Sequence, residues 1–178
     1  MAEISKKESM ERLSVSSPTV TMLASAGLIV RVGRGYDDGS VDRLAAQRHL
    51  TYAPWNQGDR LGVGLPLTTR GGWNYSLYLD AGNDRAVAVA QMPPQQGQDV
   101  SGWWSIGDPM ARMLVEQGGV LLGTTGTFVH QAARVLDVYT RQDRRRVFLV
   151  KPIIGEDLAS YLGVIPHMTQ KNGYVALP

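Results

Sequence analysis

Apolar residues are sparse at the N-terminus of the chain. After it they are more frequent and occur in short runs. Charged side chains dominate residues 1–12. We expect residues 1–13 to form an arm, because so polar a segment has few side chains that could pack on a core of its own. Residues 14–178 are expected to form a single domain, since this is an ordinary size for one hydrophobic core.

Alternation of apolar and polar residues predicts several short strands joined by tight turns. Val20 to Val32 is rich in β-branched side chains and predicts one strand or two. Residues 128–139 are ambiguous, because the segment has helical spacing at its start and strand-like alternation at its end. Hairpins are expected to join residues 75–79 to 85–90, 135–139 to 146–151, and 163–169 to 174–177.

Helix signals are fewer and local. Ser40 is a candidate N-cap for a helix that ends near His49, and Asp108 is a candidate N-cap for a second helix with a proline in its first turn. Residues 156–162 are expected to form a third helix. The pattern therefore predicts an α+β fold, β-rich, with about five to eight short and mostly antiparallel strands and about two to four short helices.

Composition narrows the classes of function. The chain has 178 residues, with 20 Gly, 9 Pro and no Cys. The many glycines suit tight turns between short strands, and the lack of cysteine excludes disulfides, thiolate nucleophiles and cysteine metal ligands. No apolar run reaches the roughly 18–20 residues of a membrane span, and no signal peptide is recognisable. We expect a cytoplasmic or virion location, with neither a cofactor nor a bound metal.

Positive charge is concentrated in one place. The formal net charge is +2, and residues 141–146 contribute +3 through four Arg and one Asp, so the rest of the chain carries −1. Guanidinium groups bind phosphates and carboxylates through paired hydrogen bonds. Arg141, Arg144, Arg145 and Arg146 are therefore candidates for an interface or an anion-binding site. The alternative is a solvated turn that discourages pairing of the sheet edge.

Two adjacent tryptophans are the other interface candidates. Trp103 and Trp104 would point to opposite faces of a strand, so we expect one of them to be exposed or at an interface. The glycine loop of residues 33–39 has the spacing G-x-G-x-x-x-G. Asp37 and Asp38 would repel a nucleotide phosphate there, and we interpret the loop as a plain turn that leads into a helix.

The histidines indicate no catalytic or metal site. His49, His130 and His167 share no short metal-ligand spacing, and the chain has no G-x-S-x-G motif. A site assembled in space stays open, so a small hydrolase or transferase is one alternative. Enzymatic function is not favoured.

The sequence favours a non-catalytic structural or interaction subunit of a larger assembly. The first hypothesis is a virion component, such as a phage capsid, connector or tail protein. The alternatives are a subunit of a secretion or conjugation machine and a nucleic-acid-binding protein that uses the arginine-rich turn. The expected partners are copies of the chain or other assembly subunits, contacted through the N-terminal arm and exposed Trp or Arg side chains.

Overall fold

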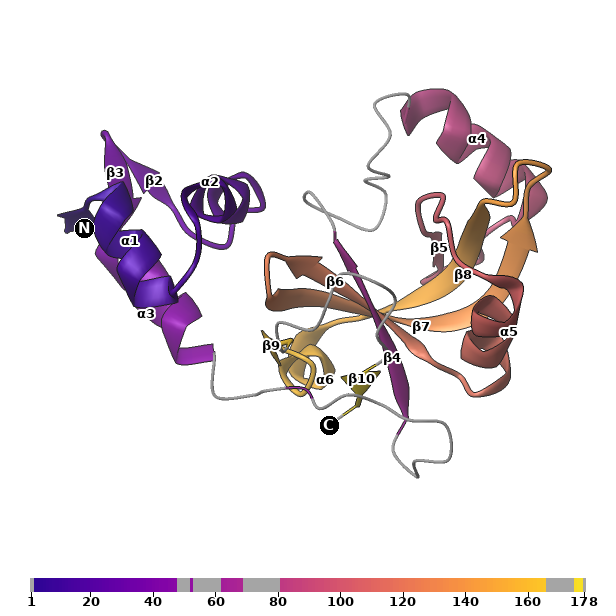
Figure 1. Cartoon of the computed structure of the whole chain (residues 1–178). Helices are drawn as coiled ribbons and strands as arrows, with labels where there is room; N and C mark the ends of the chain where they lie inside the picture. Colours follow the sequence, from indigo (N-terminus) through magenta and orange to yellow (C-terminus); the bar gives the residue numbers. More distant parts are fainter. Residues whose placement is uncertain (1, 48–51, 53–61, 69–80, 166–174, 178) are drawn as a thin grey trace.

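The computed structural model describes residues 2–47, 52, 62–68, 81–165 and 175–177. They form an α+β fold with mostly antiparallel strands, as predicted. A small N-terminal unit, residues 2–47, lies beside a larger body that is built on one twisted sheet (Figure 1). No helix among the described residues is long and apolar enough to cross a membrane.

The N-terminal unit combines three short helices with a three-stranded sheet. Its elements are β1 (Glu3–Ile4), α1 (Lys6–Leu13), α2 (Ser17–Ser25), β2 (Arg31–Val32), β3 (Gly35–Asp37) and α3 (Asp38–Ala46). β3 lies between β1 and β2 and is antiparallel to both. The helices and strands share one apolar core, made of Ile4, Leu13, Val20, Leu23, Ile29, Tyr36, Val41 and Leu44.

Two expectations for this unit are wrong. The first residues do pack on a core, because β1 and α1 bury their few apolar side chains, Ile4 and Leu13 among them. Of the one or two strands predicted over Val20 to Val32, only Arg31–Val32 is strand, and the start of the segment is helical, since Val20 and Leu23 lie three residues apart on the buried face of α2. How the chain divides into domains stays a prediction.

The body holds the remaining elements. They are β4 (Val63–Thr68), α4 (Ala81–Gln91), β5 (Asp99–Val100), α5 (Asp108–Glu116), β6 (Val120–Thr125), β7 (Phe128–Thr140), β8 (Arg146–Ile153), α6 (Gly155–Ala159), β9 (Gly163–Val164) and β10 (Val175–Ala176). The strand order is β10-β4-β6-β7-β8-β5, with β9 also paired to β7. Only the β4–β6 pair is parallel among the described strand pairs.

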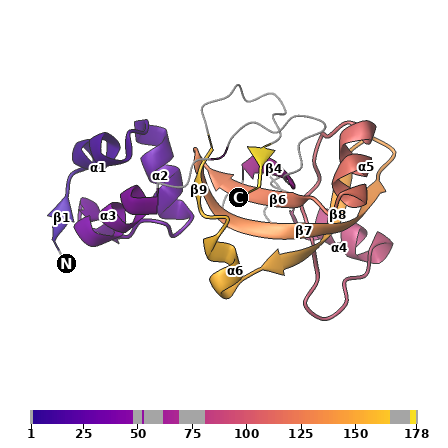
Figure 2. The same cartoon turned by 90° about the horizontal axis from the view of Figure 1, so that it is seen from below.

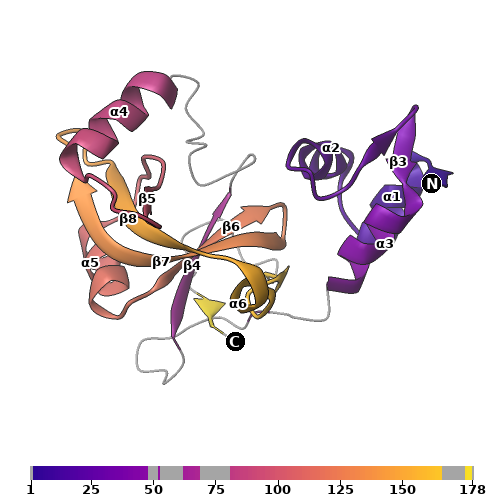
Figure 3. The same cartoon turned by 180° about the vertical axis from the view of Figure 1, so that it is seen from behind.

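Two helices cover the sheet near the end where β7 turns into β8 (Figures 1 and 3). α5 packs through Ala111 and Leu114 on the sheet face that carries Phe148. α4 packs through Ala88 on a separate cluster that contains Val147 and Trp103. Because neighbours on a strand point to opposite faces, Val147 and Phe148 belong to different core layers.

The predicted hairpins fare differently. The hairpin around the arginine-rich turn is confirmed, and the ambiguous residues 128–139 belong to its first strand. The hairpin that included residues 85–90 is wrong, because these residues are helical: alanine is the best helix former, and Ala88 and Met92, four residues apart, are both buried. The last hairpin is wrong for its described residues, since β9 pairs with β7 and β10 with β4.

The helix starts are close to their predicted places, but their caps differ. α3 begins at Asp38 with Asp37 as its N-cap, and Ser40 lies one turn further on. α5 begins at Asp108, with Gly107 in the capping position. The expected end of the first of these helices at His49 lies outside the described residues.

The N-terminal unit meets the body at the tip of the β6–β7 hairpin (Figure 2). Phe128 of β7 is fully buried and joins the core of the N-terminal unit. The turn residue Gly126 has a positive φ of 60°, and a Cβ there would lie 2.6 Å from Cγ2 of Thr19. Glycine is therefore required at this turn both for its backbone conformation and for the close approach of α2.

Candidate nucleic-acid interface

A helix-turn-helix occupies the first half of the N-terminal unit. α1 ends at Ser14, which has a left-handed backbone (φ 50°), and the N–H of Val15 donates to the carbonyl of Met10 at 3.1 Å. This is the usual closure of a helix C-terminus. Ser16 then takes the N-cap position of α2, and its hydroxyl lies 2.9 Å from that of Thr19. The two helices are thus joined by the three residues 14–16.

A two-stranded hairpin follows the second helix. β2 and β3 are joined through Gly33 and Arg34, and Gly33 has a positive φ of 56°, as the first central residue of a type II′ turn requires. A Cβ on Gly35 would lie 2.2 Å from the carbonyl oxygen of Ile4 in β1. The glycine-rich sequence here builds a tight hairpin against β1, which supports its interpretation as a turn.

Hydrogen bonds fix this hairpin to its neighbours. The carboxylate of Glu3 accepts the backbone N–H of Arg34 at 3.0 Å. The hydroxyl of Ser40 accepts the N–H of Val30 at 2.9 Å and donates to the carbonyl of Asp37 at 2.8 Å. The Asp37 carboxylate caps α3 by accepting the N–H of Ser40 at 2.9 Å. The start of β2 and the start of α3 are therefore held together by one buried serine.

Three acidic residues of α1 and α3 converge on Arg12. Its guanidinium donates to Glu8 at 2.6 Å, to Asp38 at 2.5 Å and to Asp42 at 2.8 Å. These three carboxylates raise the pKa of Arg12 further above its ordinary value. Asp38 and Asp42 thus have an arginine as their partner. Within the described part of the chain, no group of three or more His, Asp or Glu residues could hold a metal ion.

The charges of the N-terminal unit are unevenly distributed. Residues 2–47 contain six basic and six acidic side chains, yet residues 14–36 contain two arginines and no acidic residue. Those arginines, Arg31 and Arg34, are exposed on the β2–β3 hairpin. Lys6 adds a third basic group next to α2, because its Nζ donates to the hydroxyl of Thr21 on that helix at 2.9 Å. Basic side chains therefore outnumber acidic ones around α2 and the hairpin, where Glu3 is the acidic neighbour, while Glu8, Asp38 and Asp42 lie on the α1 and α3 side.

The arginine turn, residues 141–146, differs from the sequence expectation. Arg146 is only 5% exposed, and its Nε donates to Asp108 of α5 at 3.1 Å. Arg141 donates to Asp143 through Nε at 3.1 Å and through Nη2 at 2.6 Å. Arg145 lies 3.6 Å from the same carboxylate. Arg144 is exposed, with a positive φ of 65°.

These contacts lower the pKa of both carboxylates. Hydrogen bonds from Arg141 lower the pKa of Asp143 to about 2, and the hydrogen bonds from Arg146 lower the pKa of Asp108. Both groups therefore stay ionised to a lower pH than an ordinary aspartate. Three of the four arginines contact a carboxylate of the same chain, so the four do not form one open anion site.

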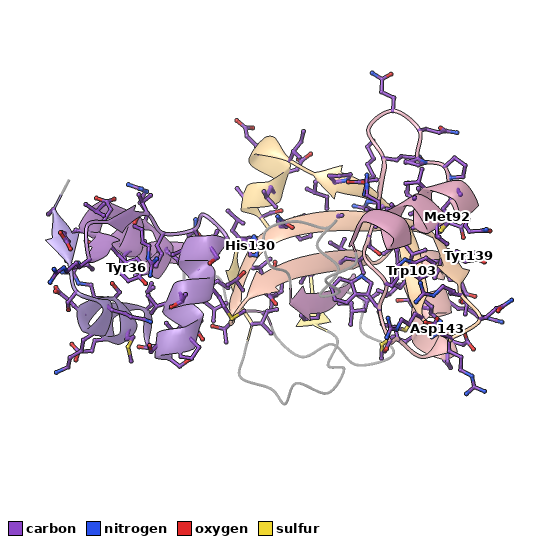
Figure 4. The ribbon with its side chains drawn as sticks, turned by 90° about the horizontal axis from the view of Figure 1, so that it is seen from above. Tyr36, Met92, Trp103, His130, Tyr139 and Asp143 are labelled. Carbon is purple, nitrogen blue, oxygen red and sulfur yellow. The ribbon has the colours of Figure 1, made fainter. Side chains whose placement is uncertain are left out.

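The tryptophans are not surface anchors. Trp103 is 1% exposed and Trp104 is 7% exposed, so the expectation that one of them is exposed is wrong. They do face opposite sides, with Trp103 in the layer under α4 and Trp104 in the layer under α5. Arg141 lies over the Trp103 ring at 4.5 Å, and Tyr139 meets that ring edge-on at 6.1 Å. Figure 4 shows Trp103, Tyr139 and Asp143 near one another at one end of the body.

Of the three histidines, the structure describes His130 alone. It is the extra residue of a β-bulge between β6 and β7, and its Nε2 lies 3.0 Å from the hydroxyl of Thr125. Burial lowers the pKa of His130 to about 4, so the imidazole is neutral at pH 7. Figure 4 places it at the opposite end of the body from Trp103, toward the N-terminal unit. His49 and His167 lie outside the described residues.

Comparisons with models of protein families, with curated proteins and with solved structures found no match. The case for a site therefore depends on the geometry of this chain. Sequence reasoning missed the helix-turn-helix, although two local signals were present. Ser5 and Glu8 have the spacing of a capping box at the start of α1, and Pro18 stands in the first turn of α2.

Proposed function

We propose that this protein binds double-stranded DNA through its N-terminal unit, with α2 in the major groove and the β2–β3 hairpin against the backbone. The observation that carries the proposal is the arrangement of α1, the turn at residues 14–16 and α2, followed at once by an exposed hairpin. In helix-turn-helix proteins the second helix enters the major groove while the first crosses the backbone.

The charge distribution of the unit supports this orientation. Lys6 hydrogen-bonds Thr21 of α2, and Arg31 and Arg34 are exposed on the hairpin that follows α2, within residues 14–36, which contain no acidic residue. Glu8, Asp38 and Asp42 are gathered around Arg12 instead. Phosphates would thus meet positive charge on the α2 side and negative charge on the α1 and α3 side.

Salt dependence of binding tests the proposal. Full-length protein is titrated into a fluorescent duplex of mixed sequence, and anisotropy gives the affinity over a range of salt concentrations. Each phosphate contact adds about −0.9 to the slope of log affinity against log salt concentration. Three basic side chains therefore predict a slope of about −2.7. Affinity that does not change with salt would contradict the proposal.

A matched pair of variants locates the interface. Arg31→Ala/Arg34→Ala should reduce the slope by about 2 and weaken binding roughly tenfold at low salt, since two phosphate contacts are lost. Arg43→Ala removes an exposed arginine from α3 on the acidic side and should leave the slope unchanged. Equal effects of the two changes would argue against the assigned face.

The assembly role, including its virion form, stays a prediction. Its sequence argument was a polar arm held by neighbouring subunits, and residues 3–13 pack within the N-terminal unit instead. Light scattering with size-exclusion chromatography on the full chain tests it. A monomer at all concentrations would count against self-assembly and would leave the DNA proposal intact.

A further inference from the structure

The exposed side of α2, which would face the base pairs, has small polar and apolar side chains. The residues of α2 that are exposed or half-exposed and lie away from the core are Ser17, Pro18, Thr21, Met22 and Ser25. None of them is Arg, Lys, Asn or Gln. Those four residue types hold a guanine or adenine edge through two hydrogen bonds in the major groove. α2 therefore has no side chain with which to make the common purine contacts.

Two of the three hydroxyl groups on this face, those of Thr21 and Ser25, are already engaged. The Thr21 hydroxyl donates to the carbonyl of Ser17 at 3.4 Å and accepts from Lys6 at 2.9 Å. The Ser25 hydroxyl donates to the carbonyl of Thr21 at 3.0 Å. A hydroxyl has one proton to donate, so both protons are directed to the helix backbone. The group of Thr21 that remains for a base edge is its methyl.

Pro18, Thr21 and Met22 form an apolar patch on the first two turns of α2. Their spacing of i, i+3 and i+4 places them on one side of the helix. Met22 is half-exposed and does not belong to the core cluster of the unit. The body touches α2 elsewhere, where Gly126 approaches Thr19. The N-terminal residues of a recognition helix are those that reach base edges, and here they are apolar.

Thymine carries the matching group, because its C5-methyl is the apolar feature of the major groove. We infer that α2 selects DNA by packing the apolar patch against thymine methyl groups, while Lys6, Arg31 and Arg34 supply affinity through phosphates. This inference rests on the proposed function and names the class of DNA site that the protein recognises, namely sites with thymines at the positions that α2 faces.

Replacement of thymine by deoxyuridine removes only the methyl group and therefore tests the contact directly. Binding sites are first selected from a random duplex pool with the full-length protein. Each thymine of a selected site is then changed to deoxyuridine, and affinity is measured at fixed salt. Every methyl that the patch covers should contribute roughly fourfold to affinity, as expected for burial of one such group. The salt slope should not change.

Two substitutions at Thr21 separate its methyl from its hydroxyl. Thr21→Ser keeps the hydroxyl and removes the methyl, so one thymine position should lose its roughly fourfold preference over deoxyuridine. Thr21→Val keeps a methyl and removes the hydroxyl, so that preference should persist. Thr21 is exposed, and both variants should unfold at nearly the wild-type temperature.

The outcomes distinguish this inference from the function on which it rests. Salt-dependent duplex binding that selects no thymine, or that is unaffected by deoxyuridine, would overturn methyl recognition and leave DNA binding standing. Loss of affinity with 7-deazaguanine in place of guanine would show purine readout and would overturn it as well. Absence of any duplex binding would overturn both.

Discussion

The arginine turn and the N-terminal unit both concentrate basic residues, but they use them in different ways. In the turn, Asp143 accepts hydrogen bonds from Arg141, and Asp108 accepts them from Arg146. In the N-terminal unit, Arg12 gathers three carboxylates while Arg31 and Arg34 stay exposed on a hairpin. The turn is the denser cluster along the sequence, whereas the N-terminal unit is the anion surface that we propose.

The difference shows that the local density of arginines is a poor guide to anion binding. A guanidinium that is paired with a carboxylate of its own chain has little affinity left for a phosphate. The turn residues instead join structural layers, because Arg141 lies over Trp103 and Arg146 reaches α5. Exposed arginines close to a helix that could enter the major groove are a better indication of DNA binding.

The largest expected effect on stability comes from Trp103, the ring on which Arg141 of the arginine turn packs. Trp103→Ala removes a large side chain that is 1% exposed and the ring under Arg141. We expect it to lower the free energy of unfolding by about 3–5 kcal/mol, measured by urea denaturation. Trp103→Phe is the control and should cost less. A Trp103→Ala protein that is as stable as wild type would contradict a structural role for the cluster.

A comparable change in the N-terminal unit should have a different functional result. Leu23→Ala creates a cavity in the core under α2 and should cost about 2–5 kcal/mol. Since the unit is small, this is a large part of its stability. Duplex binding should then be lost, whereas a folded Trp103→Ala protein should retain it. The anisotropy assay on both variants compares the two regions directly, and equal loss of binding would break the comparison.

Acid should reveal the ion pairs of the turn. The pKa of Asp143 is lowered to about 2 from an ordinary value of 3.8, so its contribution to stability is complete above pH 3.8 and is lost as the pH falls toward 2. Asp143→Asn should therefore be less stable than wild type at pH 6, and the difference should shrink below pH 4. Urea denaturation over this range measures it. A difference that persists undiminished at pH 2.5 would point to another cause.

A small gain in duplex affinity is expected at the turn of the β2–β3 hairpin, where Glu3 lies. Glu3→Gln keeps an oxygen that can accept the Arg34 N–H and removes a negative charge beside the hairpin. Duplex affinity should rise about twofold at low salt, and the gain should vanish at high salt through screening. Glu156→Gln in α6 is the matched control for loss of one exposed acidic charge. A loss of affinity in Glu3→Gln would place the hairpin away from DNA.

The smallest effect on duplex affinity is expected at the arginine turn, which the sequence indicated as a candidate anion site. Arg144→Ala/Arg145→Ala should change duplex affinity by less than about twofold and leave the salt slope intact. A reduction of the slope by about 2 would transfer the DNA contact to the arginine turn and break the comparison. The same titrations that test the hairpin arginines decide this point.

Part of the fold could be predicted from local signals. The β7–β8 hairpin follows from alternation on either side of a polar turn, and α5 follows from Asp108 and Pro109 at its start. Helix α2 was missed because Val20 and Thr21 favour strands when the segment is considered alone. Leu23 and Val20 become one buried stripe only when α1 and α3 supply the surface on which they pack.

The sequence by itself determined the α+β class and the turn between β7 and β8, since these depend on propensity and on neighbouring residues. Only the tertiary structure decided which charges are available. Arg12 and Asp38 are 26 residues apart, and Arg146 and Asp108 are 38 residues apart. No local pattern predicts such pairs, because they form only when packing brings distant segments together.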